Sequence, residues 1–230
     1  MRLAIIPARS GSKRLKNKNI KLFKKKPLIF WTIDAAKKSK IFDYIFVSTN
    51  SKKIQKISQT YGAKCSFLRT SFFNDKSTTD QVVFDVLRDL KIKKNLEFKE
   101  VFLLMPTCPN RTSEDLKKFN NYLKQESRKK IVNFASTIVE YPHFLNPTFS
   151  LFDKNNKKIF LYPKKLDKKS NKLSKFYTLT GSIRYARVTE FLKVKSFLNK
   201  KTIYQSVPFE NSIDIDTKED FKLALKLRKT

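Results

Sequence analysis

The sequence is poor in the residues that carry nucleophilic and redox chemistry. It holds 2 cysteines, Cys65 and Cys108, and 1 histidine, His143, among 230 residues. Two isolated cysteines exclude a disulfide framework and the ligand spacing of a zinc site. One histidine excludes a multi-histidine metal site and argues against a Ser-His-Asp triad. Any chemistry should therefore rest on carboxylates, lysines, arginines and, if one is bound, a metal ion.

Long apolar runs are missing too. No stretch reaches the ~18–20 apolar residues of a membrane span, and the apolar run at Leu3–Ile6 is too short for a signal peptide. We therefore expect no membrane partner. With so few cysteines, a cytoplasmic protein with reduced thiols is the default expectation.

Acidic residues are scarce beside basic ones. The chain has 20 Asp+Glu against 51 Lys+Arg, a formal net charge of +31. Such a charge suits a nucleic-acid or anionic partner. However, the lysines are spread over nearly every segment, often in pairs, and no basic tail stands apart. We interpret most of this charge as solvated surface and expect no specific nucleic-acid partner.

The rest of the composition is typical of a folded α/β domain. The hydrophobic fraction is 40%, and short apolar runs alternate with amphipathic segments. This alternation predicts a mostly parallel sheet with helices on both faces. Strands are expected at 3–6, 44–49, 63–68, 101–105, 131–138, 183–188 and 203–207, and helices at 27–38, 51–61, 78–91, from 112 or 113, and at 217–227.

One stretch breaks the alternation. Residues 139–182 are rich in Pro, Asn, Phe and Lys and show no clean helical pattern before the next strand. We expect an inserted, β-rich arm here, within a single domain that spans residues 1–230.

A basic loop, Pro7–Ile20, directly follows the first predicted strand. It combines Gly11 and two serines with several lysines, arginines and asparagines. Ligands sit at the carboxyl ends of parallel strands, small residues let backbone N–H groups approach an anion, and the cations neutralise it. The loop therefore suits a nucleoside triphosphate, although it is neither a Walker A motif nor a dinucleotide fingerprint. A solvated basic loop is the alternative.

Two carboxylates stand near the end of the chain. Asp214 and Asp216 are two residues apart in an extended segment, so both point to one face. This pair predicts a divalent cation with oxygen ligands, such as Mg²⁺ bridging to substrate phosphates. The alternative is a helix cap at Asp216 or Thr217, with Asp220 in the first turn. Both interpretations can hold together.

A third motif, Pro106–Thr112, follows the fourth predicted strand. In this order the three motifs resemble those of the acylneuraminate cytidylyltransferases, the CMP-sialic acid synthetases. That family's patterns I-P-A-R-G-G-S-K-R-x-x-x-K-N-I, P-T-S-P-x-R-T and D-I-D-T-x-E-D are similar to Ile6–Ile20, Pro106–Thr112 and Asp214–Asp220. Val47–Asn50 looks like the family's V-S-T-D. Arg69 and the stretch from Asp75 to Asp80 look like its arginine and D-x-x-T-x-D segment.

The resemblance implies a Rossmann-like nucleotidyltransferase fold and a Mg²⁺-dependent enzyme that activates a sialic-acid-like sugar with CTP and releases pyrophosphate. It implies a homodimer in which the arm reaches the partner's active site. Arg9, Lys18 and Asp216 would be catalytic, and Asp214 and Asp216 would bind the metal. The other nucleotide-binding residues would be Ser10, Gly11, Ser12, Lys13, Asn19, Ser48, Asn50, Arg69 and Asp80.

The departures from the family pattern fall on the sugar side. Met105 stands where the family often has Gln, and Thr178–Arg184 replaces R-P-N-G-A-I-Y. These changes predict an unusual acceptor, such as a legionaminic- or pseudaminic-type nonulosonic acid or another 3-deoxy-2-keto sugar acid. Three alternatives stay open: the synthetase for the octulosonic sugar, whose motif has K-P-L where this chain has Lys18–Ile20, a Mg²⁺-dependent glycosyltransferase, and a basic nucleic-acid-binding module.

Overall fold

A six-stranded sheet forms the centre of the computed structural model, which describes residues 1–72, 74, 77–155, 157–162 and 173–228. The strand order is β10-β6-β9-β5-β1-β4. All neighbouring strands are parallel except β9, which runs antiparallel between β5 and β6. The strands are β1 (Arg2–Pro7), β4 (Tyr44–Ser48), β5 (Glu100–Leu103), β6 (Phe134–Glu140), β9 (Tyr177–Arg187) and β10 (Thr202–Ser206). The mostly parallel sheet confirms the predicted fold class.

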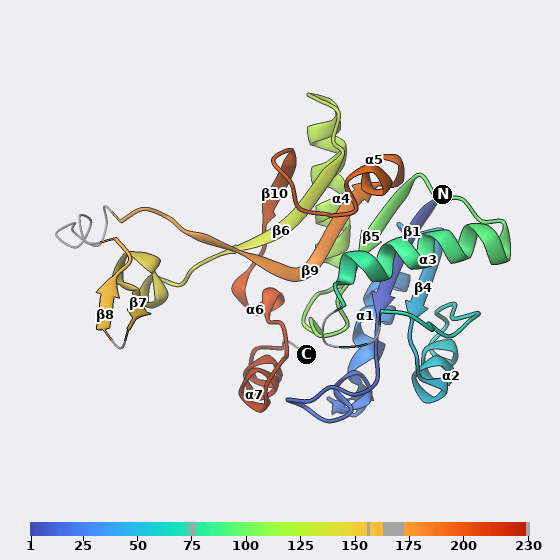
Figure 1. Ribbon diagram of the computed structural model, residues 1–230, viewed down its shortest axis with the longest axis horizontal. Coiled ribbons are helices and arrows are strands. Elements are labelled where there is room, and N and C mark those ends of the chain that lie inside the picture. Colours follow the sequence, from blue (N-terminus) through green and yellow to red (C-terminus); the bar gives the residue numbers. More distant parts are fainter. Residues whose placement is uncertain (73, 75–76, 156, 163–172, 229–230) are drawn as a thin grey trace.

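Helices cover both faces of this sheet (Figure 1). On one face α1 (Leu28–Ser39), α2 (Lys52–Thr60) and α4 (Ser113–Ser127) pack against Ala4 and Ile6 of β1. On the other face α3 (Thr79–Lys94) and α5 (Val188–Val194) pack against Leu3 and Ile5. All four of these β1 side chains are fully buried. A central parallel strand must be apolar on both faces, which explains the unbroken run at the start of the sequence.

The helix starts are set by side-chain caps. Ser51 accepts a hydrogen bond from the backbone N–H of Ile54 at the start of α2. Thr78, Thr112 and Thr217 form capping boxes at the starts of α3, α4 and α7 (Lys218–Leu227). Each cap satisfies N–H groups that the first helical turn leaves free. The helix starts predicted from these polar residues are therefore confirmed.

Two predicted strands differ in the structure. Residues 63–68 form only an isolated bridge between Lys64 and Phe46, because the carbonyl of Cys65 accepts from the side chains of Gln55 and Gln59 and the chain then turns away. The strand expected at 183–188 begins earlier, at Tyr177, where small polar residues hide the pattern, and residue 188 already starts α5.

The segment after β6 leaves the sheet. It makes two short 3-10 turns, η2 (His143–Leu145) and η3 (Pro147–Phe149), and the antiparallel hairpin of β7 (Leu151–Lys154) and β8 (Lys157–Phe160). The hairpin stands away from the sheet (Figure 1) and every residue of its two strands is exposed. Both ends of the expected arm, 139–140 and 177–182, belong to β6 and β9. Residues 156 and 163–172 of the expected arm lie outside the described residues.

Smaller elements shape the loop after β1 and the C-terminal part. These are η1 (Lys18–Ile20), β2 (Leu22–Phe23), β3 (Lys26–Pro27) and α6 (Phe209–Ser212). Leu15 of the loop, Phe23 of β2 and Leu28 of α1 form a small apolar cluster with Ile213 and Ile215. This cluster ties the basic loop to the segment that carries the paired carboxylates. No helix within the described ranges has the length and hydropathy that crossing a membrane requires.

Candidate active site

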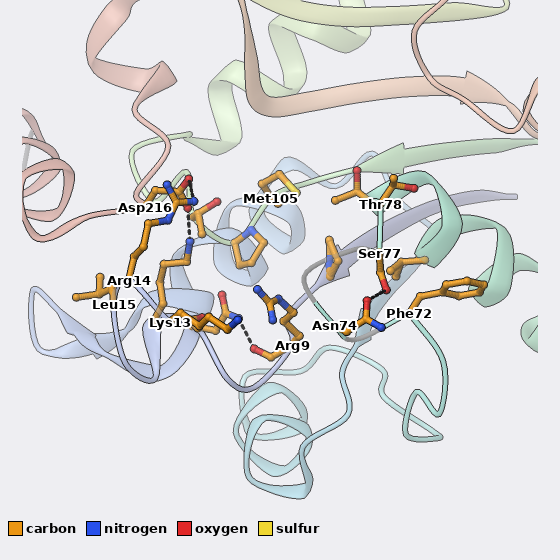
Figure 2. A pocket seen from close by; sticks show the side chains of 18 of the residues that line it. Arg9, Lys13, Arg14, Leu15, Phe72, Asn74, Ser77, Thr78, Met105 and Asp216 are labelled. Atoms are coloured by element: carbon orange, nitrogen blue, oxygen red, sulfur yellow. Dashed lines mark hydrogen bonds and ion pairs between the residues drawn. The ribbon is translucent and has the colours of Figure 1, made fainter.

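A cleft of about 470 Å³ opens at the carboxyl ends of β1 and β5 (Figure 2). The loop after β1 forms one wall, the start of α3 another, and the loop after β5 the floor. Its lining residues include Arg9, Ser12, Lys13, Arg14, Lys18, Asn19, Arg69, Phe72, Thr78, Met105, Thr107 and Asp216. Motifs that are far apart in the sequence thus meet in one cleft.

The basic loop is held in shape by two asparagines. Asn50 accepts hydrogen bonds from the backbone N–H of Ser10 (2.9 Å) and from its hydroxyl (3.2 Å). Asn19 donates from Nδ2 to the carbonyl of Arg9 (2.9 Å). Gly11 has a φ of +77°, a conformation that side-chain-bearing residues rarely adopt. These residues therefore fix the course of the loop, while Ser12 and Lys13 face the cleft.

Two arginines converge on the cleft. Arg69 is buried, with 7% of its surface exposed, and its Nε has no hydrogen-bond partner among the described residues. Burial, together with the nearby positive charge of Arg9, lowers the pKa of Arg69 to about 10. Two guanidinium groups that repel each other at the edge of a cleft form a site for a polyanion, because an anion relieves the repulsion and supplies an acceptor to Nε of Arg69.

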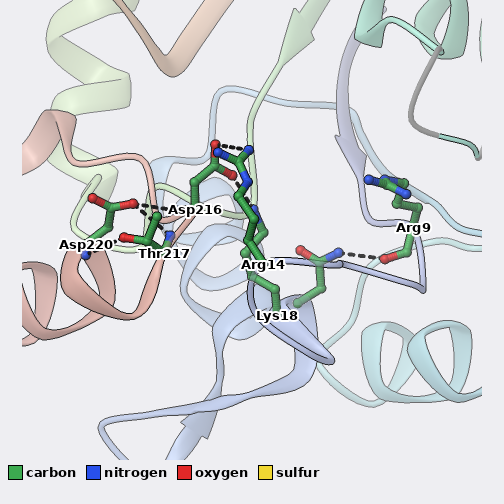
Figure 3. A network of polar contacts seen from close by, with 7 residues as sticks. Arg9, Arg14, Lys18, Asp216, Thr217 and Asp220 are labelled. Carbon is green, nitrogen blue, oxygen red and sulfur yellow. Dashed lines mark hydrogen bonds and ion pairs between the residues drawn. The ribbon is translucent and has the colours of Figure 1, made fainter.

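Asp216 faces the cleft and forms two ion pairs (Figure 3). Lys18 donates from Nζ to Oδ1 (2.7 Å), and Arg14 donates from Nη2 to Oδ2 (2.7 Å). The capping box of α7 does not use this side chain, because Thr217 and Asp220 form it. The helix cap and a carboxylate aimed at the cleft therefore exist together.

Asp214 lies beside the cleft. Ile213 and Ile215 are buried in the small apolar cluster, so the alternating Asp214 and Asp216 point to the other side of the strand-like segment. Part of Asp214 reaches solvent, but protein crowds its carboxyl group: a Cβ on Gly181 would lie 2.6 Å from Oδ2. This burial raises the pKa of the Asp214 carboxyl, and the charge of Asp216 raises it further.

Asp214 and Asp216 are the residues of this site that could ligate a divalent cation. No cluster of three or more His, Cys, Asp or Glu side chains occurs in the described residues, so a cation here would take ligands beyond the protein. Mg²⁺ is commonly held in this way, by one or two carboxylates, water and substrate phosphates.

The comparison with known proteins decides the family. The family model described as cytidylyltransferase matches residues 3–230. The chain belongs to the cytidylyltransferase family. This membership confirms the resemblance of the three motifs to the acylneuraminate enzymes.

Relatives within the family match along nearly the whole chain. The chain is 34% identical to a CMP-N,N'-diacetyllegionaminic acid synthase of Legionella pneumophila, covering 98% of this chain and 95% of the relative. It is 31% identical to an N-acylneuraminate cytidylyltransferase of Streptococcus agalactiae serotype V over 95% of this chain, but spans only about half (51%) of that protein. A solved CMP:2-keto-3-deoxy-manno-octonic acid synthetase complexed with CTP has the same fold, with a TM-score of 0.66 at 16% identity, covering 98% and 97% of the two chains.

Arg111 of the third family motif is structural. It is only 1% exposed, and burial lowers its pKa to about 10. Its guanidinium donates to the carbonyls of Ser182 and Met105 and to the hydroxyl of Thr32. It thereby joins the loop after β5 to β9 and α1. The side chain of Met105 reaches the cleft from this fixed loop.

The structure brings most of the expected site residues of this family member together. Arg9, Ser12, Lys13, Lys18, Asn19, Arg69 and Asp216 line the cleft, and Asp214 lies next to it. In the part of the chain that the structure describes, Ser10, Gly11, Ser48, Asn50 and Asp80 do not line it. Ser48 is buried in β4, and Oδ1 of Asp80, in the first turn of α3, is buried without a hydrogen-bond partner. Asp75 lies outside the described residues.

Arg14 and Thr107 are among the cleft residues that were not assigned a role from the sequence. Arg14 contacts Asp216, and Thr107 lines the floor, where its carbonyl accepts a hydrogen bond from the backbone N–H of Ile215 (2.8 Å), between the two aspartates. Both lie within the recognised motifs, so the sequence indicates that they are near the site. Only the folded chain shows which residues they contact there.

Proposed function

We propose that this chain transfers CMP from CTP to a nonulosonic acid and releases pyrophosphate. The observation that carries this proposal is the cleft itself, which brings Arg9 and the other cations of the basic loop together with Arg69 and with the carboxylate of Asp216. A polyanion site facing a carboxylate pair suits a triphosphate with its Mg²⁺ ion. The similarity to the Legionella legionaminic acid synthase and the Streptococcus N-acylneuraminate cytidylyltransferase supports it.

In the proposed reaction the anomeric hydroxyl of the sugar acid attacks the α-phosphorus of CTP. The new bond joins the hydroxyl oxygen to this phosphorus, and the bond to the pyrophosphate oxygen breaks on the opposite side. The hydroxyl proton passes to a base in the cleft or to water. Arg9, Lys13 and Lys18 neutralise charge on the phosphates, and such positioning and neutralisation account for most of the catalysis of phosphoryl transfer. Mg²⁺, held by Asp214 and Asp216, would supply further charge neutralisation when bound.

The acceptor side supports a sugar acid that differs from sialic acid. Met105 lies on the cleft floor, and Arg184 stands where the family pattern has tyrosine. Arg184 is half-buried, lies close enough for its charge to act on Asp214, and has an Nε without a hydrogen-bond partner among the described residues. Any nonulosonic acid offers a carboxylate to such a cation. The two departures from the family pattern, at Met105 and Arg184, are what favour an acceptor of the legionaminic or pseudaminic type.

The octulosonic acid synthetase is a weaker alternative. Its motif has proline where this chain has Asn19, and proline cannot donate the hydrogen bond that Asn19 gives to the carbonyl of Arg9. The match to the cytidylyltransferase family and its named relatives favours CMP transfer over the glycosyltransferase and nucleic-acid alternatives. The cytoplasm suits this enzyme, since Cys65 and Cys108 are free and buried.

The test is pyrophosphate release from purified protein with Mg²⁺, each of the four nucleoside triphosphates, and a panel of nonulosonic and octulosonic acids. Release with CTP and a nonulosonic acid alone is the expected result. Release only with an octulosonic acid would establish the alternative synthetase. If no pair gives release and calorimetry detects no CTP binding, the proposal is wrong.

A homodimer is expected in solution, formed through the arm. Leu151 and Phe152 of β7 and Ile159 and Phe160 of β8 are 39–50% exposed. A two-stranded hairpin is marginally stable alone in water, so its apolar side chains need a partner surface. Light scattering should give twice the 27.1 kDa chain mass. Replacing Phe152 and Phe160 by serine should shift the protein toward the monomer. If the protein without substitutions is already a monomer, the expectation is wrong.

Gly181→Ala is expected to weaken binding of Mn²⁺, a paramagnetic substitute for Mg²⁺, by about 10–100-fold, the range seen when a group that positions a metal ligand changes. The added Cβ would lie 2.6 Å from Oδ2 of Asp214, so the carboxylate must move. Electron paramagnetic resonance titration measures this affinity. Ser182→Ala is the control, because it changes the neighbouring residue by removing an atom and so adds no atom beside Asp214. Equal affinities in the two variants would show that Gly181 does not position Asp214.

A further inference from the structure

Both carboxylate oxygens of Asp216 are engaged by cations of the basic loop. Oδ1 accepts from Lys18 and Oδ2 from Arg14, each at 2.7 Å. The two cations differ in their surroundings: the Arg14 side chain is 68% exposed, whereas that of Lys18 is 15% exposed. A divalent cation that approached Asp216 from solvent would meet the positive charge of Arg14, the more exposed of the two cations.

The cluster already holds more positive than negative groups. Asp214 and Asp216 are two carboxylates, Lys18 and Arg14 pair with Asp216, and Lys18 and Arg184 lie close enough for their charges to act on Asp214. Adding Mg²⁺ while Arg14 stays would increase this excess of positive charge. An exposed ion pair contributes little to stability, so Arg14 can leave Asp216 at a small cost in free energy. Lys18 is mostly shielded from water, so separating its ammonium group from the carboxylate would cost more.

We propose that Arg14 is a displaceable counter-ion of Asp216. It holds the carboxylate in the metal-free protein, leaves when Mg²⁺ arrives, and then pairs with the triphosphate. Arg14 lines the same cleft as Ser12 and Lys13, so the phosphates that arrive with the metal lie within its loop's reach. This inference rests on the proposed metal site and adds a role that the family motif does not give.

The exchange couples metal binding to nucleotide binding. With no nucleotide, displaced Arg14 loses its partner and the metal binds weakly. With CTP present, Arg14 gains a phosphate partner and the metal binds more tightly. By linkage the metal raises CTP affinity by the same factor. Arg14 thus favours loading of the metal and the nucleotide together.

Arg14→Gln tests this role, with Lys16→Gln as matched control. Lys16 is an exposed lysine of the same loop, so its variant removes the same charge without touching Asp216. Mn²⁺ binding is titrated by electron paramagnetic resonance, first alone and then with CTP but no sugar. Relative to Lys16→Gln, Arg14→Gln should bind Mn²⁺ alone about two- to fivefold more tightly, the range that corresponds to an exposed ion pair. Its gain in affinity on adding CTP should be smaller by a similar factor.

The outcomes distinguish the proposed role of Arg14 from the proposed metal site at Asp216. Equal Mn²⁺ affinities and equal gains with CTP in Arg14→Gln and Lys16→Gln would overturn the role of Arg14 while leaving the metal site intact. Asp216→Asn supplies the second comparison, because it should weaken Mn²⁺ binding in every condition. If it binds Mn²⁺ as the unchanged protein does, the metal does not bind at Asp216 and both proposals are wrong.

Discussion

Asp216→Asn is expected to lower kcat for CMP transfer by about 10²–10³-fold, the usual effect of losing one charge contact to the reacting group in a desolvated site. Asparagine keeps the shape of the side chain but cannot hold Mg²⁺ as a carboxylate does. It also ends the ion pairs with Lys18 and Arg14. Initial rates of pyrophosphate release with saturating CTP measure the loss.

The fold of this variant should be unchanged. The capping box of α7 uses Thr217 and Asp220 and does not need Asp216. Asp34→Asn is a matched control: Asp34 also pairs with a lysine, Lys38, at 2.8 Å, but does not line the cleft. Its activity should stay within about twofold, in line with the small effects of exposed ion pairs. Full activity of Asp216→Asn would remove the metal assignment.

The local parts of the site could be predicted from the sequence. The apolar run at Leu3–Ile6 and the loop after it place a basic turn at the end of a buried strand, and the polar residue Thr217 marks the start of α7. These features depend on neighbours in the chain. The alternation of Ile213 and Ile215 with two aspartates likewise fixes which side each residue faces.

The long-range contacts of the site could not be predicted in this way. Arg14 and Asp216 are 202 positions apart, and nothing local shows that they meet. Asn50 was expected beside the nucleotide, but it holds the backbone of Ser10. The antiparallel β9 escaped prediction before residue 183 because Thr180, Gly181 and Ser182 carry no apolar alternation. Their burial comes from the neighbouring strands.

Arg111→Met is expected to lower the free energy of unfolding by about 1–3 kcal/mol, because it removes the donor of three buried hydrogen bonds. Methionine fills much of the same space, so the loss comes from polar groups rather than from a cavity. The carbonyls of Ser182 and Met105 and the hydroxyl of Thr32 each lose a donor. A buried acceptor without a partner costs about 1–3 kcal/mol. Urea denaturation measures the difference.

Arg187→Met on the same strand as Ser182 is the control for this prediction. Arg187 is exposed and donates from Nε to one carbonyl, that of Val132, at 3.2 Å. Its replacement should change the free energy of unfolding by about 0.5 kcal/mol or less, as surface substitutions usually do. A similarly small effect at Arg111 would mean that the three acceptors find other donors or water. Arg111 would then not hold the loop, and the position of Met105 in the cleft would depend on its hydrogen bonds with Gly181, Cys108 and Thr32.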